Sequence, residues 1–485
     1  MEEADPAIVA FLRESLPARD LDEARLMALA GAARAERFPA GEVILHQGGE
    51  PAGHLYVIRS GYVEVRVDGQ LVDLPGVGEV FGELSLLAGS APTATVRATE
   101  DVECLLLDPE AATAVLGTAA GVSFVQASLR RGLSRSLDTD GHTLLDAIEH
   151  ADDETAAVAA ARELPAGVCA LVASGADATK VGRVVGSSID ALTRRLLGFA
   201  AADLGEAPVP WAWLALGSEA RLEQALHTDQ DHALAYDPGE RTAEELDPYF
   251  AQLAERVTAG LESAGIPRCN GDAMAIHPGL RRSIDSWADA FRSWMADPSL
   301  DGSILSSIAF DFRRIGGPLD VEPALQAVMA TAPRQYPQFL RHLTHRALDR
   351  KPPTGFLRNL VVEAKGDHAG RFDIKRGGVA IIANIARAYS VAAGGSEKGT
   401  LDRFRAAEAS GQMTSGRREA IEEAFRLLWQ IRLQHQVRQV ENAETPDDFV
   451  DPAHLGPIAR LGLKEAFRIV GSEQQTLATE LGVDL

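Results

Sequence analysis

The chain has 485 residues, of which 46% are hydrophobic, and it carries a formal net charge of −23 at pH 7. Its length and apolar content predict two or three domains with sizeable cores, whereas the negative charge argues against sequence-independent binding of nucleic acid. The acidic N-terminus and the lack of an uninterrupted apolar run of ~18 residues argue against a secretory signal and a membrane span, so we expect a cytoplasmic protein.

The cysteines are few and lie far apart in the sequence, at Cys104, Cys169 and Cys269. Their spacing fits neither a disulfide scaffold nor a zinc site. We therefore expect them to be small hydrophobic side chains without a metal role.

Residues 1–136 contain short strands separated by glycines, after two short helical stretches. The strands are expected at 43–45, 55–58, 62–67, 71–74 and 95–98. Asp68-Gly69 is a strong hairpin signal between two of them. Closely spaced strands of this kind are typical of a small antiparallel barrel or jelly roll.

The run Phe81 to Leu87 resembles the ligand-binding cassette of the cyclic nucleotide-binding domain. The resemblance implies a barrel ligand site at Gly82 and Glu83, with Glu83 holding a ribose. That family places an arginine a few residues later, where it pairs with the cyclic phosphate. Here Pro92 or Thr93 falls at that position, and neither has a cationic side chain that could form two hydrogen bonds with the phosphate. A structural or altered-ligand role is therefore favoured over cAMP binding.

Residues 137–206 are rich in alanine and place apolar residues at helical spacing, for example at Leu144, Leu145 and Ile148. This pattern predicts a helical bundle segment. Pro208 and Pro210 then end the last helix before the first strand of the next domain.

Residues 207–318 alternate strand-like and helical patterns, which predicts an α/β core. Apolar runs at 213–216 and 233–236 read as two buried strands on either side of an acidic junction. Further strands are expected at 273–276 and 307–312.

The acidic junction carries the strongest functional signal in the chain. Gly217-Ser218 forms a small turn after a strand, so that backbone N–H groups can approach phosphate oxygens. Asp229 and Asp231 are two residues apart in an extended segment, and therefore face the same way. Such carboxylates suit Mg²⁺ or Mn²⁺ bound to a triphosphate.

This arrangement, together with Phe310 to Arg313 and Asp373 to Gly378, resembles the polymerase-beta-type nucleotidyltransferase superfamily. Within it, the likeness is to bacterial proteins that share the nucleotidyltransferase domain of PII uridylyltransferase and carry an N-terminal cyclic nucleotide-binding-like domain. The resemblance implies that Asp229 and Asp231 hold the metal, and that Asp311 completes the metal site or acts as the base. An ion pair of Asp311 with Arg313 or Arg314 is the alternative.

Positive groups must offset a bound triphosphate. The candidates are Arg221, Arg282, Arg313, Lys375 and Arg376. Arg221 follows the glycine turn closely, and the Lys375-Arg376 pair precedes an apolar helix whose N-terminus could bind an anion. Taken singly, each of these residues is more commonly a solvated surface cation.

Residues 319–485 read as an all-helical C-terminal domain. Within it, Arg432, His435 and Arg438 recur three residues apart and line one side of a helix. A solvated helix face is favoured for them over a position at the edge of a cleft.

The sequence therefore predicts a multidomain α+β protein with a β jelly-roll barrel, a helical bundle, an α/β nucleotidyltransferase core and a C-terminal helical domain. The expected activity is transfer of NMP from an NTP to an acceptor hydroxyl, and the resemblance implies a protein tyrosine as one candidate acceptor. No nucleic-acid or membrane partner is expected. A non-catalytic nucleotide-binding signalling protein and a cyclic-nucleotide sensor are the alternatives, and the NTP base and oligomeric state stay open.

Overall fold

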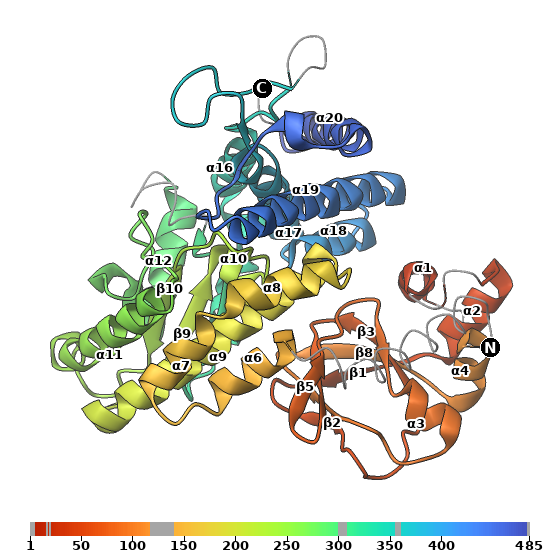
Figure 1. The fold of residues 1–485 in the computed structure, drawn as a ribbon, viewed down its shortest axis with the longest axis horizontal. Coiled ribbons are helices and arrows are strands. Elements are labelled where there is room, and N and C mark those ends of the chain that lie inside the picture. The colour runs from red at the N-terminus through yellow and green to blue at the C-terminus, as the bar shows by residue number, and fades with distance from the viewer. Residues whose placement is uncertain are drawn as a thin grey trace. The chain divides into compact units, whose positions relative to one another are not determined.

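The computed structural model describes residues 5–15, 18, 21–116, 140–298, 308–354 and 360–482. The chain divides into two compact units, Met1–Asp146 and Ala147–Leu485 (Figure 1). The predicted boundary between residues 136 and 137 lies outside the described residues.

The first unit is a sandwich of two antiparallel four-stranded sheets, which confirms the predicted jelly roll. The sheets have the strand orders β1-β8-β3-β6 and β2-β7-β4-β5. The strands are β1 (Arg34–Phe38), β2 (Val43–Leu45), β3 (Leu55–Ser60), β4 (Val63–Val67), β5 (Gln70–Asp73), β6 (Val80–Phe81), β7 (Thr95–Ala98) and β8 (Val102–Leu107). The helices are α1 (Pro6–Glu14), α2 (Glu23–Ala32), α3 (Glu83–Ala88) and α4 (Pro109–Leu116), and the boundary between the two units falls within α6 (Asp140–Glu149).

Strand β3 lies between two apolar clusters of this unit. Leu55 and Val57 belong to the cluster beneath α1 and α2, whereas Tyr56 and Ile58 belong to the cluster between the sheets. Alternate residues of a strand point to opposite faces, so a strand buried on both faces is apolar throughout.

The second unit surrounds one mixed sheet with helices. Its strands are β9 (Trp211–Leu216), β10 (His232–Tyr236), β11 (Arg281–Ser283) and β12 (Phe312–Gly316), with a separate ladder of β13 (Phe372–Asp373) and β14 (Phe449–Val450). Its α-helices are α7 (Glu154–Ala161), α8 (Leu164–Ala173), α9 (Ala178–Leu204), α10 (Gly217–Ala220), α11 (Ala243–Ser263), α12 (Ile284–Ala296), α14 (Glu322–Met329), α15 (Ala332–Gln335), α16 (Pro337–Leu348), α17 (Ala380–Ala393), α18 (Thr400–Ala409), α19 (Ser415–Glu441) and α20 (Pro457–Glu480). Three short turns of other helix types are η2 (Pro278–Leu280), η3 (Lys375–Val379) and η4 (Pro452–His454).

The mixed sheet has the strand order β11-β10-β9-β12. Strand β9 is antiparallel to β10 and to β12, while β10 is parallel to β11. Helices α9, α11 and α12 pack against this sheet, so every residue of β9 and β10 is buried (Figure 1). The predicted multidomain α+β architecture is therefore confirmed, with the acidic junction between the two central strands.

Two predicted strands are wrong in detail. Residues 273–276 form turns, although the Ala273 carbonyl accepts a hydrogen bond from the backbone N–H of His232 at 2.9 Å. In the other segment, Ser307 lies outside the described residues, and the chain from 308 to 311 makes a turn closed by the Asp311 N–H and the Ile308 carbonyl at 3.0 Å. The strand starts at Phe312 and leaves Asp311 at its entrance.

Among the described residues, one stretch, Glu154–Ala173, is long and apolar enough to cross a membrane by length and composition alone. This stretch was not predicted from the sequence as a candidate span. The structure divides this stretch into α7 and α8, which pack against α9, and α8 also packs against α19. Core helices of a globular unit pass the same test, so the stretch is weak evidence for a span.

Candidate nucleotide and metal site

The turn after β9 lies between two acidic segments. The backbone N–H of Leu216 donates to the Asp231 carbonyl at 2.8 Å, and that of Gly217 donates to the Asp311 carbonyl at 2.9 Å. Gly217 has a φ of +56°, and a β-carbon there would lie 3.2 Å from Oδ2 of Asp231 and 3.3 Å from Ile308. A glycine is therefore needed at this position to let the main chain pass close to the carboxylate.

Gln230 explains why the side chains of Asp229 and Asp231 face the same way. The side-chain amide of Gln230 is buried and donates to the carbonyls of Ile266 at 2.8 Å and Thr258 at 3.2 Å. Its backbone N–H donates to the Pro267 carbonyl at 3.1 Å. Because Gln230 is anchored in the interior, the carboxylates on either side of it are directed to the opposite side.

Among the described residues, Asp229, Asp231 and Cys269 form a candidate metal group, whose ligand atoms lie close enough together to hold one ion. One ligand atom from each lies within 4.8 Å of the other two, and all three residues are partly exposed. Oδ1 of Asp231 is itself buried and has no hydrogen-bond partner. Burial, followed by the charge of Asp229, raises the pKa of Asp231 to about 7. A buried carboxylate oxygen without a partner is costly, and a cation would remove that cost.

The position of Cys269 beside the acidic pair was not predicted from the sequence. Its segment reaches the acidic pair because Arg268 forms a parallel bridge with Gln230. Burial, followed by the charge of Asp231, raises the pKa of the Cys269 thiol to about 12. No sequence spacing could show this proximity, because the contact is made between distant segments.

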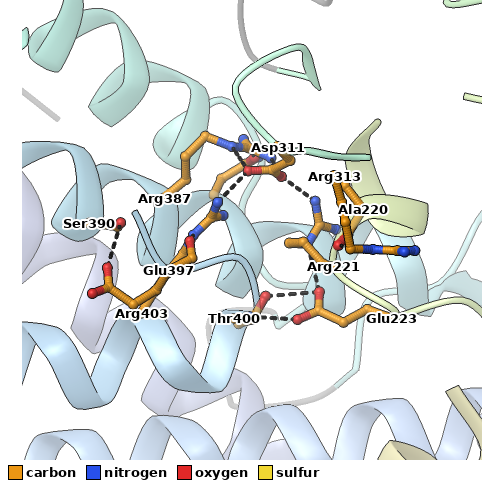
Figure 2. Close-up of polar contacts among 11 residues, drawn as sticks. Ala220, Arg221, Glu223, Asp311, Arg313, Arg387, Ser390, Glu397, Thr400 and Arg403 are labelled. Carbon is orange, nitrogen blue, oxygen red and sulfur yellow. Dashed lines mark hydrogen bonds and ion pairs between the residues drawn. The ribbon is translucent and has the colours of Figure 1, made fainter. Parts of the chain in front are cut away.

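Asp311 is not part of this group, and its carboxylate instead forms ion pairs with arginines (Figure 2). Its buried carboxylate binds Arg221, Arg387 at 2.5 Å and Arg403 at 2.7 Å. The prediction that Asp311 lies with Asp229 and Asp231 as a metal ligand is therefore not supported by this geometry. The alternative named the wrong partners, since Arg313 binds Asp190 at 2.6 Å.

Neighbouring aromatic residues explain the direction of Asp311. The rings of Phe310 and Phe312 pack against Phe291 on α12. Asp311, which lies between them in the chain, meets the arginines of α17 and α18. Burial alone would raise the pKa of Asp311, but Arg387, Arg403 and Arg221 hold it far below its ordinary value.

A second carboxylate extends the Asp311 cluster. Glu223 accepts a hydrogen bond from Nε of Arg221 at 2.7 Å, and it also accepts from the backbone N–H of Thr400 at 2.6 Å (Figure 2). A small pocket beside the cluster is lined in part by Arg221, Lys398 and Arg403. The core and the C-terminal helices thus share a buried, charged junction.

The other predicted cations differ in position. Lys375 is close enough to Asp231 for its charge to lower the pKa of that carboxyl. The side chain of Arg376 is 67% exposed, and its Nε lies 3.6 Å from the carboxylate of Asp373. The same carboxylate accepts a hydrogen bond from the backbone N–H of Arg376 at 2.7 Å. Part of the predicted anion site at this helix start is therefore occupied by Asp373. Arg282 lies over the ring of Trp287, at 5.7 Å from its centroid.

Two supporting contacts were not predicted from the sequence. Glu219 is buried and accepts a hydrogen bond from the backbone N–H of Asp231; burial, followed by the charge of Asp190, raises its pKa well above the ordinary value. Arg432 is buried on α19 and donates to the carbonyl of His227 at 2.9 Å. The expectation of a solvated face is therefore wrong for Arg432, which holds the segment entering the acidic pair.

The barrel carries the predicted cassette. Gly82 has a φ of +86°, and Glu83 starts the short helix α3 and is buried. Thr93 is exposed where the family's arginine would fall. The next arginine, Arg97, lies on β7 with its guanidinium 3.5 Å from Glu64.

We expect the full chain to bind cAMP weakly or not at all, because a phosphate in the barrel would lose a charge-assisted hydrogen bond. Calorimetric titration with cAMP and cGMP measures this, and Thr93→Arg is the matched gain-of-charge variant. Thr93→Arg should bind more tightly than wild type. Micromolar or tighter affinity in the wild type would contradict the expectation.

Three family matches cover separate parts of the chain. Residues 35–118 match "Cyclic nucleotide-binding domain", residues 162–301 match "Putative nucleotidyltransferase DUF294", and residues 337–481 match "Putative nucleotidyltransferase substrate binding domain". The matched segments include the barrel cassette, the acidic pair with Cys269, and the arginines of α17 and α18.

Curated relatives are similar over shorter segments. The chain is 34% identical over 99 residues to a cGMP-dependent protein kinase of Eimeria tenella, covering 20% of this chain and 10% of the kinase. It is 37% identical over 104 residues to an uncharacterized protein of Mycobacterium tuberculosis, covering 21% of this chain and 20% of that protein. The chain thus spans about a tenth to a fifth of the length of these relatives.

Solved structures of protein kinase A regulatory subunits are also similar. The regulatory domain of Toxoplasma gondii protein kinase A with cAMP has a TM-score of 0.22 and 25% identity, covering 32% of this chain and 57% of that one. A second structure, a regulatory-subunit domain bound to Sp-2Cl-cAMPS, has a TM-score of 0.23 and 21% identity, covering 27% of this chain and 84% of that one.

Proposed function

The chain belongs to the DUF294 nucleotidyltransferase family in the form that carries an N-terminal cyclic nucleotide-binding domain, and on this premise we propose that it transfers NMP from an NTP to an acceptor hydroxyl. The observation that carries the proposal is the pair Asp229 and Asp231 beside the Gly217 turn, with a buried Asp231 oxygen that has no partner. The proposed setting is the cytoplasm, and the barrel would regulate the reaction.

The carboxylates fit a divalent ion such as Mg²⁺ or Mn²⁺. When bound, the ion would neutralise phosphate charge and stabilise the leaving pyrophosphate. Asp229 and Asp231 would hold it, while Gly217 and Ser218 leave room for phosphate oxygens beside them. Lys375 supplies positive charge close to the same carboxylates.

Asp311 has a different role in this proposal. It fixes Arg221, Arg387 and Arg403 at the junction between the core and the C-terminal helices. These helices match the substrate-binding family, so the acceptor would enter from their side. A protein hydroxyl, such as the tyrosine implied by the likeness to PII uridylyltransferase, is the proposed acceptor class.

The test is incubation of the full chain with each labelled NTP, Mg²⁺ or Mn²⁺, and lysate from its own host. The expected result is one labelled acceptor and released pyrophosphate, both lost in the Asp229→Asn/Asp231→Asn variant. Metal-dependent NTP binding without any labelled product would favour the non-catalytic signalling protein. Labelling by the double variant at the wild-type rate would refute the proposed site.

A further inference from the structure

The thiol of Cys269 has an arrangement that its sequence position does not suggest. The backbone N–H of Gly271 donates to Sγ at 3.2 Å. Hydrogen bonds from backbone amides stabilise a negatively charged sulfur, as they do around metal-bound thiolates. The local chain is therefore arranged for a sulfur that accepts a hydrogen bond.

The same sulfur lies against the acidic pair. The three ligand atoms of Asp229, Asp231 and Cys269 lie within 4.8 Å of one another. Ligands on opposite sides of one ion, with metal–oxygen bonds of about 2.1 Å and a metal–sulfur bond of about 2.3 Å, are at most about 4.5 Å apart. Small side-chain movements would bring all three atoms onto one ion.

We propose that Cys269 is the third protein ligand of the cation held by Asp229 and Asp231, and that this sulfur makes the site prefer a borderline or soft divalent ion, such as Zn²⁺ or Cd²⁺, over Mg²⁺. The inference rests on the metal role proposed above for the two aspartates. On binding, the S–H bond breaks, the proton leaves to solvent, and a metal–sulfur bond forms in its place. A coordinating thiol is deprotonated by the charge of the ion, and thiolates favour soft ions while carboxylates alone suit Mg²⁺.

Partial exposure of all three residues makes the site open. An open position is typical of catalytic metal sites, in which a substrate oxygen or water completes the coordination. A soft ion held by two carboxylates and a thiolate would therefore still leave room for a phosphate. The identity of the ion, and not its presence alone, would then set the activity.

The test is titration of the full chain, without nucleotide, with Cd²⁺ while the ultraviolet thiolate-to-metal charge-transfer band is recorded. Wild type should show a saturable band at one Cd²⁺ per chain. Cys269→Ser should lose the band, and its Cd²⁺ affinity should fall by at least about tenfold. Its Mg²⁺ affinity should stay within about twofold of wild type, since serine keeps the shape and the carboxylates remain. Cys169→Ser is the matched control, because Cys169 is also a partly buried free cysteine, and it should keep the band.

A band that persists in Cys269→Ser, or the absence of a band in wild type, would overturn the proposal. Equal loss of Mg²⁺ and Cd²⁺ affinity in Cys269→Ser would also overturn it, because that result indicates a structural role. The outcome is separate from that of the proposed activity. If the chain shows the band but transfers no nucleotide, the assignment of Cys269 as a metal ligand stands and the proposed activity is refuted. If the chain transfers nucleotide without showing the band, the proposed activity stands and the ligand assignment is refuted.

Discussion

Replacing Asp229 and Asp231 together with asparagine should abolish metal-dependent NTP binding. Asparagine keeps the size of the side chains but removes both negative charges, so a hard divalent ion loses its ligands. We expect the affinity for NTP with Mg²⁺ to fall by at least about 100-fold, because even loss of an outer-shell partner typically costs roughly 10–100-fold in metal affinity. Calorimetry with and without the metal measures the difference.

The matched control is Asp272→Asn. Asp272 is a neighbouring aspartate whose side chain is 79% exposed and which lies outside the candidate metal group. It should bind NTP and metal as wild type does. Equal metal-dependent binding by wild type and the double variant would remove the assignment of these ligands.

Asp311→Asn should destabilise the second unit strongly. Three buried guanidinium groups share this one carboxylate, and its side chain is fully buried. Removing one partner of a buried ion pair leaves uncompensated charge and typically costs about 3–5 kcal/mol. Urea unfolding, followed by a probe in the second unit, measures the loss.

The control for Asp311→Asn is Asp289→Asn, which breaks an exposed pair with Arg292. That change should cost no more than about 1 kcal/mol. A stable Asp311→Asn variant that binds NTP normally yet fails to transfer it would contradict the structural role and restore the catalytic one.

The pH dependence of stability follows from the same cluster. The pKa of Asp311 is held far below its ordinary value in the folded chain, so its contribution is fully present above the unfolded pKa of about 4. The contribution is lost as the pH falls below that value, because the unfolded state then takes up the proton first. Asp311→Asn should lack this component and show a shallower loss of stability in acid.

The sequence could show Gly217, Asp229 and Asp231 because their roles depend on local geometry. A backbone position with positive φ favours glycine, and two side chains on the same face of an extended segment are two residues apart. Both features can be recognised in the sequence. The partners of Asp311 leave no such mark, since Arg387 and Arg403 arrive from helices 76 and 92 positions away. The same is true of Cys269, which reaches Asp231 through a bridge between distant segments.

The strand errors have a similar cause. Ala273, Met274 and Ala275 are buried, as the apolar run suggested, yet burial alone does not decide whether the backbone forms a ladder. The true edge strand, β11, reads as polar because it contains two arginines. Arg281 is buried there because the carbonyl of Ala275 and the carboxylate of Asp247 accept its donors.

The buried hydrogen bonds and ion pairs between the core and the C-terminal helices limit how segments of such chains can be exchanged. Thr400 with Glu223, and Arg432 with the His227 carbonyl, each join residues from two separately matched families. A graft that exchanged only one of the two segments would leave buried charges and polar groups without counterparts. The core and the C-terminal helices must therefore be inherited, swapped or truncated together, even though two separate family models match them.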